Sequence, residues 1–318
     1  MIKHLHLLIL GFAAMATSLL SAAESYLVME AHSGRVLLAH NSEAKRPVAS
    51  LTKIATAKVL LDWAEASNAS LATLAVVPNS AMAPGGANPM GLAPGDRISL
   101  RDAAYSALLG SDNVAAMTIA DHVGRALLAH RRRTGDPQEA FVAEMNQLAK
   151  ALGMKRTRFA NPHGLELPRQ RAYSSAADIA RLCVYAMRDT GFQFYVKQKT
   201  RQISVTKSDG RHLSYEVANT NTLLGKQGVN GIKTGLTTAA GQCLATNSHR
   251  SPVVTKLDAT RSQIRKRDLI VVVLGSADRF GRTSQLIPQG WAAYDAWAAQ
   301  GYIQSAHKRE FIIVPKLP

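Results

Sequence analysis

Two polar residues, Ser50 and Lys53, stand three positions apart at the start of an apolar stretch with helical spacing. On a helix, residues three apart lie on one face, so the lysine amine reaches the serine hydroxyl. A serine hydroxyl attacks a carbonyl carbon only when a neighbouring base accepts its proton. A lysine amine is such a base when burial and a nearby cation lower its pKa from about 10.4 to about 7. The pair therefore indicates acyl transfer by a serine nucleophile with a lysine base.

The spacing of this pair is not specific by itself. The same Ser-x-x-Lys pattern recurs at residues 42–45, 204–207 and 305–308, and a serine at a helix start often serves only as a helix cap. Among the four matches, only Ser50 follows a predicted strand hairpin and opens a long apolar helix. Its hydroxyl and amide are therefore expected at the positive end of a helix, where a nucleophile and an oxyanion donor are needed.

Two further polar motifs follow along the chain. Ser111-Asp112-Asn113 separates two helical patterns, and Lys233-Thr234-Gly235 ends an apolar strand pattern. Taken alone, the first is also a normal helix stop and restart, and the second a normal strand end. In this order, however, Ser-x-x-Lys, Ser-x-Asn and Lys-Thr-Gly form the motif set of penicillin-binding proteins and class A β-lactamases.

The chain resembles the serine D-alanyl-D-alanine carboxypeptidases, the low-molecular-mass penicillin-binding proteins, over nearly all of residues 25–297. Besides the three motifs, the resemblance rests on residues 91–96, 161–165 and 240–244. It implies a hydrolase that acts on peptidoglycan stem peptides through an acyl-enzyme on Ser50. It also implies that β-lactam antibiotics inhibit the protein by acylating the same serine.

The resemblance assigns the chemical steps to motif residues. Ser50 is the nucleophile, Lys53 its base, and Ser111 relays a proton toward the leaving amine. Asn113 holds Lys53 and the substrate backbone. The backbone amides of Ser50 and Leu236 form the oxyanion hole.

The resemblance also implies how the substrate binds. Lys233, Thr234 and Gly235 receive its terminal carboxylate, and Arg279 is a second candidate contact for that carboxylate. Lys233 is the cation expected to face Lys53 across the cleft. Neither a metal nor a cofactor is expected.

The predicted elements change in kind along the chain. Strand patterns at residues 25–30 and 35–40 precede the helix that opens at Ser50, and a short strand is predicted within residues 71–77. Helical patterns then occupy residues 100–109, 114–123, 138–152 and 174–188. Strand patterns return at residues 200–206, 212–217, 229–236, 241–247 and 269–275, before a closing helix at residues 286–299.

This order predicts an α+β fold of the β-lactamase/DD-peptidase type. We expect an antiparallel five-stranded sheet flanked by helices, with an inserted all-helical subdomain at about residues 65–195. The basic, polar residues 248–267 are predicted to form a long exposed loop. The expected domains are a signal peptide at residues 1–23, a catalytic domain at residues 24–300 and a C-terminal tail at residues 301–318.

Composition limits the setting of the protein. The predicted signal peptide indicates export, and thus a periplasmic protein, with an uncleaved anchor as the alternative. The net charge of +16 favours peripheral contact with an anionic cell wall or membrane surface, whereas export argues against nucleic acid as a partner. Cys183 and Cys243 lie in apolar segments and are expected to be buried thiols, although a bridge between them is the alternative.

Three other functions compete with the carboxypeptidase. A D,D-endopeptidase is favoured by the short tail, because many of the carboxypeptidases carry a further β-rich domain and an amphipathic helix. A β-lactamase is favoured by the aspartate in Ser111-Asp112-Asn113, but Glu166 lacks the Glu-x-x-Leu-Asn context of a class A enzyme. A non-catalytic wall-binding module is disfavoured because all motif residues are intact.

Overall fold

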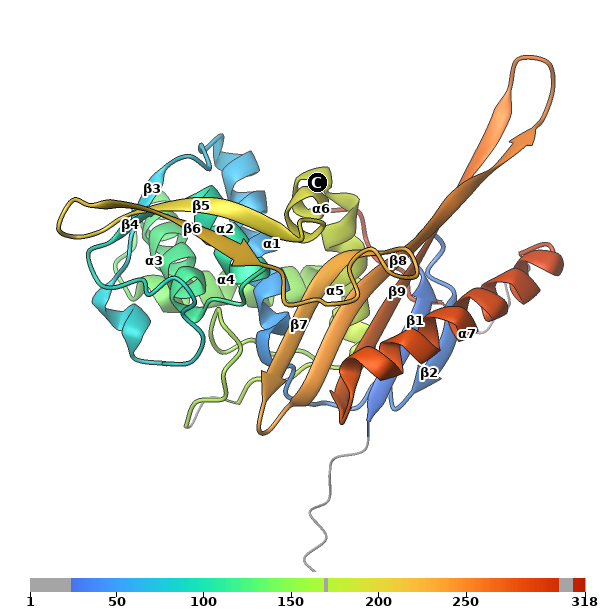
Figure 1. Ribbon diagram of the computed structural model, residues 1–318, viewed down its shortest axis with the longest axis horizontal. Coiled ribbons are helices and arrows are strands. Elements are labelled where there is room, and N and C mark those ends of the chain that lie inside the picture. Colours follow the sequence, from blue (N-terminus) through green and yellow to red (C-terminus); the bar gives the residue numbers. More distant parts are fainter. Residues whose placement is uncertain (1–23, 169–170, 303–310, 318) are drawn as a thin grey trace, which may run out of the picture.

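The main sheet of the protein is antiparallel and joins both ends of the chain (Figure 1). The computed structural model describes residues 24–168, 171–302 and 311–317, so the expected signal peptide lies outside the described residues. The sheet has the order β2-β1-β9-β8-β7. Its strands are β1 (Ser25–Glu30), β2 (Val36–His40), β7 (Val229–Thr237), β8 (Gly241–Lys256) and β9 (Ser262–Ser276).

The central strand β9 shows why this sheet is covered on both faces. Its residues Leu269 to Leu274 are all fully buried, and successive side chains of a strand point to opposite faces. Leu269, Val271 and Val273 pack with the closing helix α7 (Arg279–Ala299), which supplies Leu286 and Trp291. The alternate side chains of β9 pack with the helices on the other face. The continuous apolar run thus predicted the burial correctly.

The helices of the other face belong largely to the inserted segment. They begin with the 3₁₀ turn η1 (Ala49–Leu51) and α1 (Thr52–Ser67). The following elements are η2 (Asn79–Met82), α2 (Leu100–Leu108), α3 (Asn113–His130), α4 (Pro137–Ala151), α5 (Ala176–Arg188) and α6 (Thr190–Val196). Side chains of Asp112, Asp136, Ser175 and Asp189 cap the starts of α3, α4, α5 and α6. These caps satisfy amides that a helix start leaves without partners.

The prediction of an all-helical insertion is wrong in one respect, because a second sheet packs with these helices. Its strands follow the order β3-β4-β5-β6 and are β3 (Leu74–Val76), β4 (Arg97–Ser99), β5 (Thr200–Thr206) and β6 (His212–Ala218). Strand β4 pairs with β5 through Arg97↔Thr206 and Ile98↔Val205. Strands of three residues are too short to show an alternating pattern, so the sequence alone does not show which sheet the β5–β6 hairpin joins.

The predicted loop at residues 248–267 is also wrong. Here β8 and β9 continue as a two-stranded ribbon, paired through Val253↔Arg265, Val254↔Ile264 and Lys256↔Ser262. Figure 1 shows this ribbon projecting from the body of the protein. Both of its faces are open to solvent, so its sequence lacks the polar and apolar alternation that reveals a half-buried strand. Residues 251–267 are called the arm below.

The last described residues return to the body of the protein. Ile312 and Val314 are buried, and the N–H of Ile312 donates to the carbonyl of Gly34 at 2.8 Å. Cys183 and Cys243 are free and buried, as expected. Burial raises the pKa of the Cys243 thiol to about 11. Within the described ranges, no helix is long and apolar enough to cross a membrane.

Candidate active site

Ser50 lies in the 3₁₀ turn η1, which leads directly into α1. Lys53 is in the first turn of α1 and is fully buried. Its Nζ lies 2.9 Å from Ser50 Oγ, so the two residues share one helix face as their spacing predicted. The helix-cap alternative for Ser50 fails, because neither η1 nor α1 has a side-chain cap at its start.

Two other acceptors surround the Lys53 amine. Nζ donates to Asn113 Oδ1 at 2.7 Å and to the carbonyl of His163 at 2.8 Å. Both oxygens accept hydrogen bonds and carry no hydrogen to donate. A neutral amine has two N–H groups, which these two oxygens use. The lone pair of the neutral amine therefore remains for the Ser50 hydroxyl.

The electrostatics of the site favour that neutral amine. Burial lowers the pKa of Lys53 to about 7, against the opposing charge of Asp112. Lys233 is also buried, and its pKa is lowered well below its usual value by burial and by the charges of Lys53 and Arg279. The sequence predicted that desolvation and a facing cation would act together on Lys53. In the structure burial is the cause for Lys53, and the repulsion between the two lysines acts on the pKa of Lys233.

The Ser111-Asp112-Asn113 motif forms the turn between α2 and α3. Asp112 caps α3 by accepting from the N–H of Ala115 at 3.0 Å, and it also accepts from the Ser106 hydroxyl at 2.9 Å. Asn113 Nδ2 donates to the carbonyl of Gly85 at 3.0 Å, which turns Oδ1 of the same amide toward Lys53. Ser111 is half-buried, with φ at +62°. The motif therefore both starts a new helix, through Asp112, and contributes Asn113 to the site.

The Lys233-Thr234-Gly235 motif lies on β7, the edge strand of the main sheet. A Cβ on Gly235 would lie 3.1 Å from Ala49 Cβ and 3.2 Å from the backbone nitrogen of Ser50. The missing side chain therefore lets β7 approach the serine turn, which explains why glycine is needed here. Leu236, the next residue, is 62% exposed at the open side of the strand.

The other residues of this motif have defined partners. Lys233 Nζ donates to the carbonyl of Thr234 at 3.0 Å, and the Thr234 hydroxyl is 2.6 Å from the Thr220 hydroxyl. Arg279, at the start of α7, donates through Nη1 to the carbonyl of Gly235 at 2.8 Å. The predicted binding residues on β7 and α7 therefore lie close together in the structure.

Sequence reasoning assigned no role to the segment that completes the site. His163 supplies the carbonyl that binds Lys53, and its ring nitrogen Nδ1 accepts from the N–H of Leu165 at 3.1 Å. Burial and the charge of Lys53 lower the pKa of His163 to about 3, so its ring is neutral. Glu166 accepts from the Thr237 hydroxyl at 2.8 Å, which links this segment to β7. The only signal in the sequence was the motif-like run at residues 161–165.

Gly164 gives a direct test of how this segment supports the serine turn. Its φ is +89°, and an added Cβ would lie 2.0 Å from the carbonyl oxygen of Ala49. We expect Gly164→Ala to lower the free energy of unfolding by about 3 kcal/mol or more and to slow acylation of Ser50, because backbone must move. Denaturant unfolding and penicillin acylation rates measure the two effects.

Gly153 provides the matched control for that substitution. Its φ is +71°, but no atom lies within 4 Å of an added Cβ. Gly153→Ala should cost only the backbone strain, about 1 kcal/mol, with no change in acylation. Equal effects of the two substitutions would show that contact between residue 164 and the serine turn is unimportant.

No metal site is evident in this part of the chain. Across residues 24–168, 171–302 and 311–317, no three or more His, Cys, Asp or Glu side chains are placed to hold an ion together. The chemical groups gathered at the site are instead a serine hydroxyl, a buried amine and a second buried lysine on a sheet edge. This set is suited to acyl transfer.

Comparison with known proteins agrees with this arrangement. Residues 13–276 match the family model described as D-alanyl-D-alanine carboxypeptidase. The chain is 30% identical over 282 residues to D-alanyl-D-alanine carboxypeptidase DacC of Escherichia coli K12, covering 86% of this chain and 62% of that protein. It is 32% identical over 245 residues to a D-alanyl-D-alanine endopeptidase of Pseudomonas aeruginosa PAO1, covering 75% and 72% respectively.

Solved structures show the same architecture. The crystal structure of the Streptomyces K15 DD-transpeptidase superposes with a TM-score of 0.71 at 25% identity, covering 84% of this chain and 96% of that one. Penicillin-binding protein D2 of Listeria monocytogenes, in its ampicillin-bound form, gives a TM-score of 0.66 at 26% identity with the same coverage. The chain spans about three fifths of the length of DacC and of the E. coli carboxypeptidase DacA.

Proposed function

The chain belongs to the D-alanyl-D-alanine carboxypeptidase family, and we propose that it is a serine-type carboxypeptidase acting on peptidoglycan stem peptides. The observation that carries the proposal is the environment of the Lys53 amine. It is buried, has a pKa of about 7, and is bound by Asn113 and His163 so that its lone pair is directed to Ser50. This is the state that a base needs in order to activate a serine at neutral pH.

The first chemical step forms an acyl-enzyme. Ser50 Oγ attacks the carbonyl carbon between the two terminal D-alanines while Lys53 takes its proton. The backbone amides of Ser50 and Leu236 stabilise the oxyanion that develops. Ser111 relays a proton to the leaving amine, the C–N bond breaks, and D-alanine departs.

The second step returns the free enzyme. Water attacks the ester carbonyl, the bond to Ser50 Oγ breaks, and the serine recovers its proton. A β-lactam enters the same pathway at its strained amide, but its amine stays attached to the acyl group after the ring opens. We therefore expect such antibiotics to acylate Ser50 stoichiometrically and to leave slowly.

The terminal carboxylate of the substrate is placed against the β7 motif. Lys233 and Thr234 are its proposed contacts, with Arg279 as a second cation next to Gly235. Burial is the main cause of the lowered pKa of Lys233, and repulsion from Lys53 and Arg279 adds to it. A bound carboxylate offsets that repulsion, which gives the site a physical reason to prefer a free C-terminus.

Endopeptidase cleavage of cross-links is the second candidate. It is favoured by the P. aeruginosa endopeptidase, of which this chain covers 72%, compared with 62% of DacC. A cross-link has the same D-alanyl peptide bond, but its leaving amine belongs to a second stem peptide. The two reactions therefore use the same catalytic residues. They differ in the leaving group that the open side of the site must accommodate, which is D-alanine in one reaction and a second stem peptide in the other.

Defined muropeptides separate the two activities. We expect the protein to release D-alanine from a monomeric pentapeptide, measured by liquid chromatography and mass spectrometry, and the Ser50→Ala variant to release none. Cleavage of cross-linked dimers without any attack on the pentapeptide would replace the carboxypeptidase assignment by the endopeptidase. Rapid multiple-turnover hydrolysis of a penicillin would instead indicate a β-lactamase.

The proposed setting is the periplasm, where peptidoglycan is found. Its support is the leader pattern at residues 1–23, together with membership of a family whose members act on the cell wall. The net charge of +16 further suggests peripheral contact with an anionic wall or membrane surface.

A further inference from the structure

The arm projects from the body of the protein (Figure 1), and its sequence is rich in positive charge. Residues 251–267 contain one carboxylate, Asp258, and five cations, Lys256, Arg261, Arg265, Lys266 and Arg267. Asp258 is bound within the turn by Arg261 at 2.5 Å. Lys256 and Lys266 are exposed. The arm is therefore a basic ribbon whose single acid is already paired.

The same ribbon exposes aliphatic side chains. Val254, Leu257 and Ile264 are 59%, 61% and 65% exposed, and Val253 is 39% exposed. Val254 lies directly opposite Ile264 in the strand pairing. Lys256 and Lys266 each stand two residues further along their strands, so they share a ribbon face with this aliphatic pair. One face of the arm thus joins exposed apolar groups with flanking ammonium groups.

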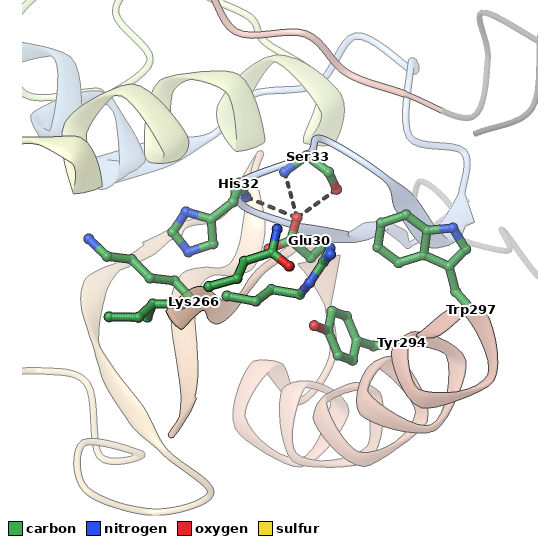
Figure 2. Close-up of a pocket in the computed structure, with 9 residues that line it drawn as sticks. Glu30, His32, Ser33, Lys266, Tyr294 and Trp297 are labelled. Carbon is green, nitrogen blue, oxygen red and sulfur yellow. Dashed lines mark hydrogen bonds between the residues drawn. The ribbon is translucent and has the colours of Figure 1, made fainter. Parts of the chain in front are cut away.

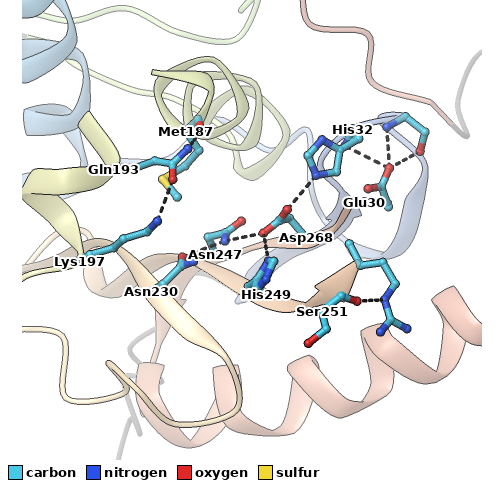
Figure 3. A network of polar contacts seen from close by, with 12 residues as sticks. Glu30, His32, Met187, Gln193, Lys197, Asn230, Asn247, His249, Ser251 and Asp268 are labelled. Atoms are coloured by element: carbon cyan, nitrogen blue, oxygen red, sulfur yellow. Dashed lines mark hydrogen bonds and ion pairs between the residues drawn. The ribbon is translucent and has the colours of Figure 1, made fainter. Parts of the chain in front are cut away.

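The foot of the arm is held firmly. Asp268 is contacted by His32 at 2.8 Å, by His249 at 3.0 Å and by Asn247 at 3.1 Å. Figure 3 shows these contacts gathered around Asp268. Glu30 accepts from the N–H of His32 at 3.1 Å in the adjoining turn (Figure 2). The Asp268–His32 contact joins the residue that follows the arm to the β1–β2 turn.

Two arginines of the arm belong to this foot. The Arg265 guanidinium lies 3.7 Å from the centre of the Tyr302 ring, and Arg267 Nε donates to the carbonyl of Ser251 at 2.7 Å. Figure 2 shows the cleft at this foot, between the β1–β2 turn and the side chains of Tyr294 and Trp297 on α7. Ile264, Arg265 and Lys266 of the arm also line this cleft. The arm is therefore presented as a braced element, and Lys256 and Lys266 are the cations on its aliphatic face.

Charge alone does not explain why the arm exposes aliphatic side chains together with lysines. Lysines on an exposed strand edge also prevent unwanted pairing with another chain, which accounts for Lys256 and Lys266 but not for exposed valine, leucine and isoleucine. A hydrophilic polyanion likewise gains nothing from aliphatic side chains. An anionic bilayer uses both groups, because its phosphates attract ammonium groups and its interface accommodates apolar side chains.

We propose that the arm docks on an anionic phospholipid surface through Val254, Ile264, Lys256 and Lys266. This proposal does not rest on the catalytic one. The Lys-Thr-Gly motif pairs with β8 near Leu244, ten residues before Val254. At about 3.3 Å per residue along a strand, the site stands roughly 30 Å from the docked face. Docking therefore leaves the catalytic serine away from the bilayer and open to the wall.

Vesicle sedimentation with the full chain tests this surface. Vesicles of phosphatidylglycerol mixed with phosphatidylethanolamine are compared with vesicles of phosphatidylcholine in about 0.1 M salt. We expect binding to the anionic vesicles alone, and a decrease of about tenfold or more for the Lys256→Gln/Lys266→Gln variant. The Val254→Ser/Ile264→Ser variant should also bind at least about fivefold more weakly, because its apolar contact is lost while its charge is kept.

The matched control is Arg132→Gln/Arg133→Gln, which removes two charges from an exposed run just after α3. It should bind within about twofold of the wild type. All variants have the same N-terminal residues, so a difference in binding between them does not come from that segment. Thermal melting followed by circular dichroism checks the folding of each variant independently of catalysis. An equal decrease in the control would show that net charge, not the arm, determines binding.

Two further outcomes would overturn the proposal in favour of another partner. Isolated peptidoglycan sacculi replace the vesicles in a parallel experiment. Arm-dependent binding to sacculi without binding to vesicles would identify an anionic wall polymer. Sedimentation velocity without vesicles tests the other partner, because a dimer that dissociates on substitution of Val254 and Ile264 would identify a second copy of this chain.

Discussion

Replacing Ser50 by alanine is expected to abolish labelling by a fluorescent penicillin and to reduce D-alanine release by at least about a thousandfold. The substitution removes the only atom to which the acyl group is transferred in the proposed reaction. It leaves the Lys53 amine bound by Asn113 and His163, so the fold of the site should survive. The labelled protein is read on a denaturing gel, and the acylated residue is located by mass spectrometry.

Ser204→Ala is the matched control for this experiment. Ser204 begins another Ser-x-x-Lys match in the sequence, but it is exposed on β5 of the second sheet. We expect this variant to be labelled at the wild-type rate. Labelling that persists in Ser50→Ala, or that is lost equally in Ser204→Ala, would contradict the choice of nucleophile.

The contrast between these two serines shows what the sequence can predict. Both have a lysine three residues later, yet only Ser50 precedes a helix, where a three-residue spacing brings side chains onto one face. Ser204 lies on strand β5, where residues three apart point to opposite faces, and Lys207 directly follows that strand. The helix that follows Ser50 was predictable from the helical spacing of its apolar residues. That helix in turn places Lys53 next to Ser50.

Contacts between distant segments were harder to predict. The two acceptors of Lys53 are 60 and 110 residues away along the chain. Asn113 was found through its motif, whereas the carbonyl of His163 is a backbone group that any residue type could supply. Gly164 likewise matters through its approach to Ala49, and only the folded chain reveals that approach.

Solvent-exposed strands were missed for a different reason. A buried strand such as β9 reveals itself by its continuous apolar run, because both faces select for it. The arm has neither face buried, and its strands are held by backbone pairing that leaves no periodic pattern. The basic and aliphatic residues were visible in the sequence, but the ribbon face that Val254 and Ile264 share with Lys256 and Lys266 was not.

Replacing Lys53 by arginine is expected to reduce acylation by at least about a thousandfold across the neutral range. A guanidinium keeps its proton at any pH at which the protein is folded, so it cannot accept one from Ser50. In the wild type, the neutral form of Lys53 increases as pH rises through its pKa of about 7. The acylation rate should therefore rise with pH around 7 and level off above it, measured by rapid-mixing fluorescence with a β-lactam.

The lowered pKa of Lys53 also reduces the free energy of unfolding at neutral pH. The pH dependence of stability therefore tests this pKa independently of catalysis. In the unfolded chain its pKa returns to about 10.5, so between pH 7 and about 10.5 the unfolded state binds more protons than the folded one. The contribution of Lys53 to the free energy of unfolding is thus least favourable below pH 7. It improves by about 1.4 kcal/mol per pH unit until the unfolded lysine loses its proton.

Comparison of the wild type with Lys53→Met isolates the titration of Lys53 together with its electrostatic coupling to Lys233 and His163, because groups that do not interact with Lys53 titrate equally in both proteins. The wild type should gain stability relative to the variant as pH rises from 7 to 10, by a few kcal/mol in all, in denaturant unfolding. A difference between the two proteins that does not change with pH would mean that Lys53 stays charged in the fold. In that case the rise of acylation near pH 7 would need another base, and the central role of Lys53 would fail.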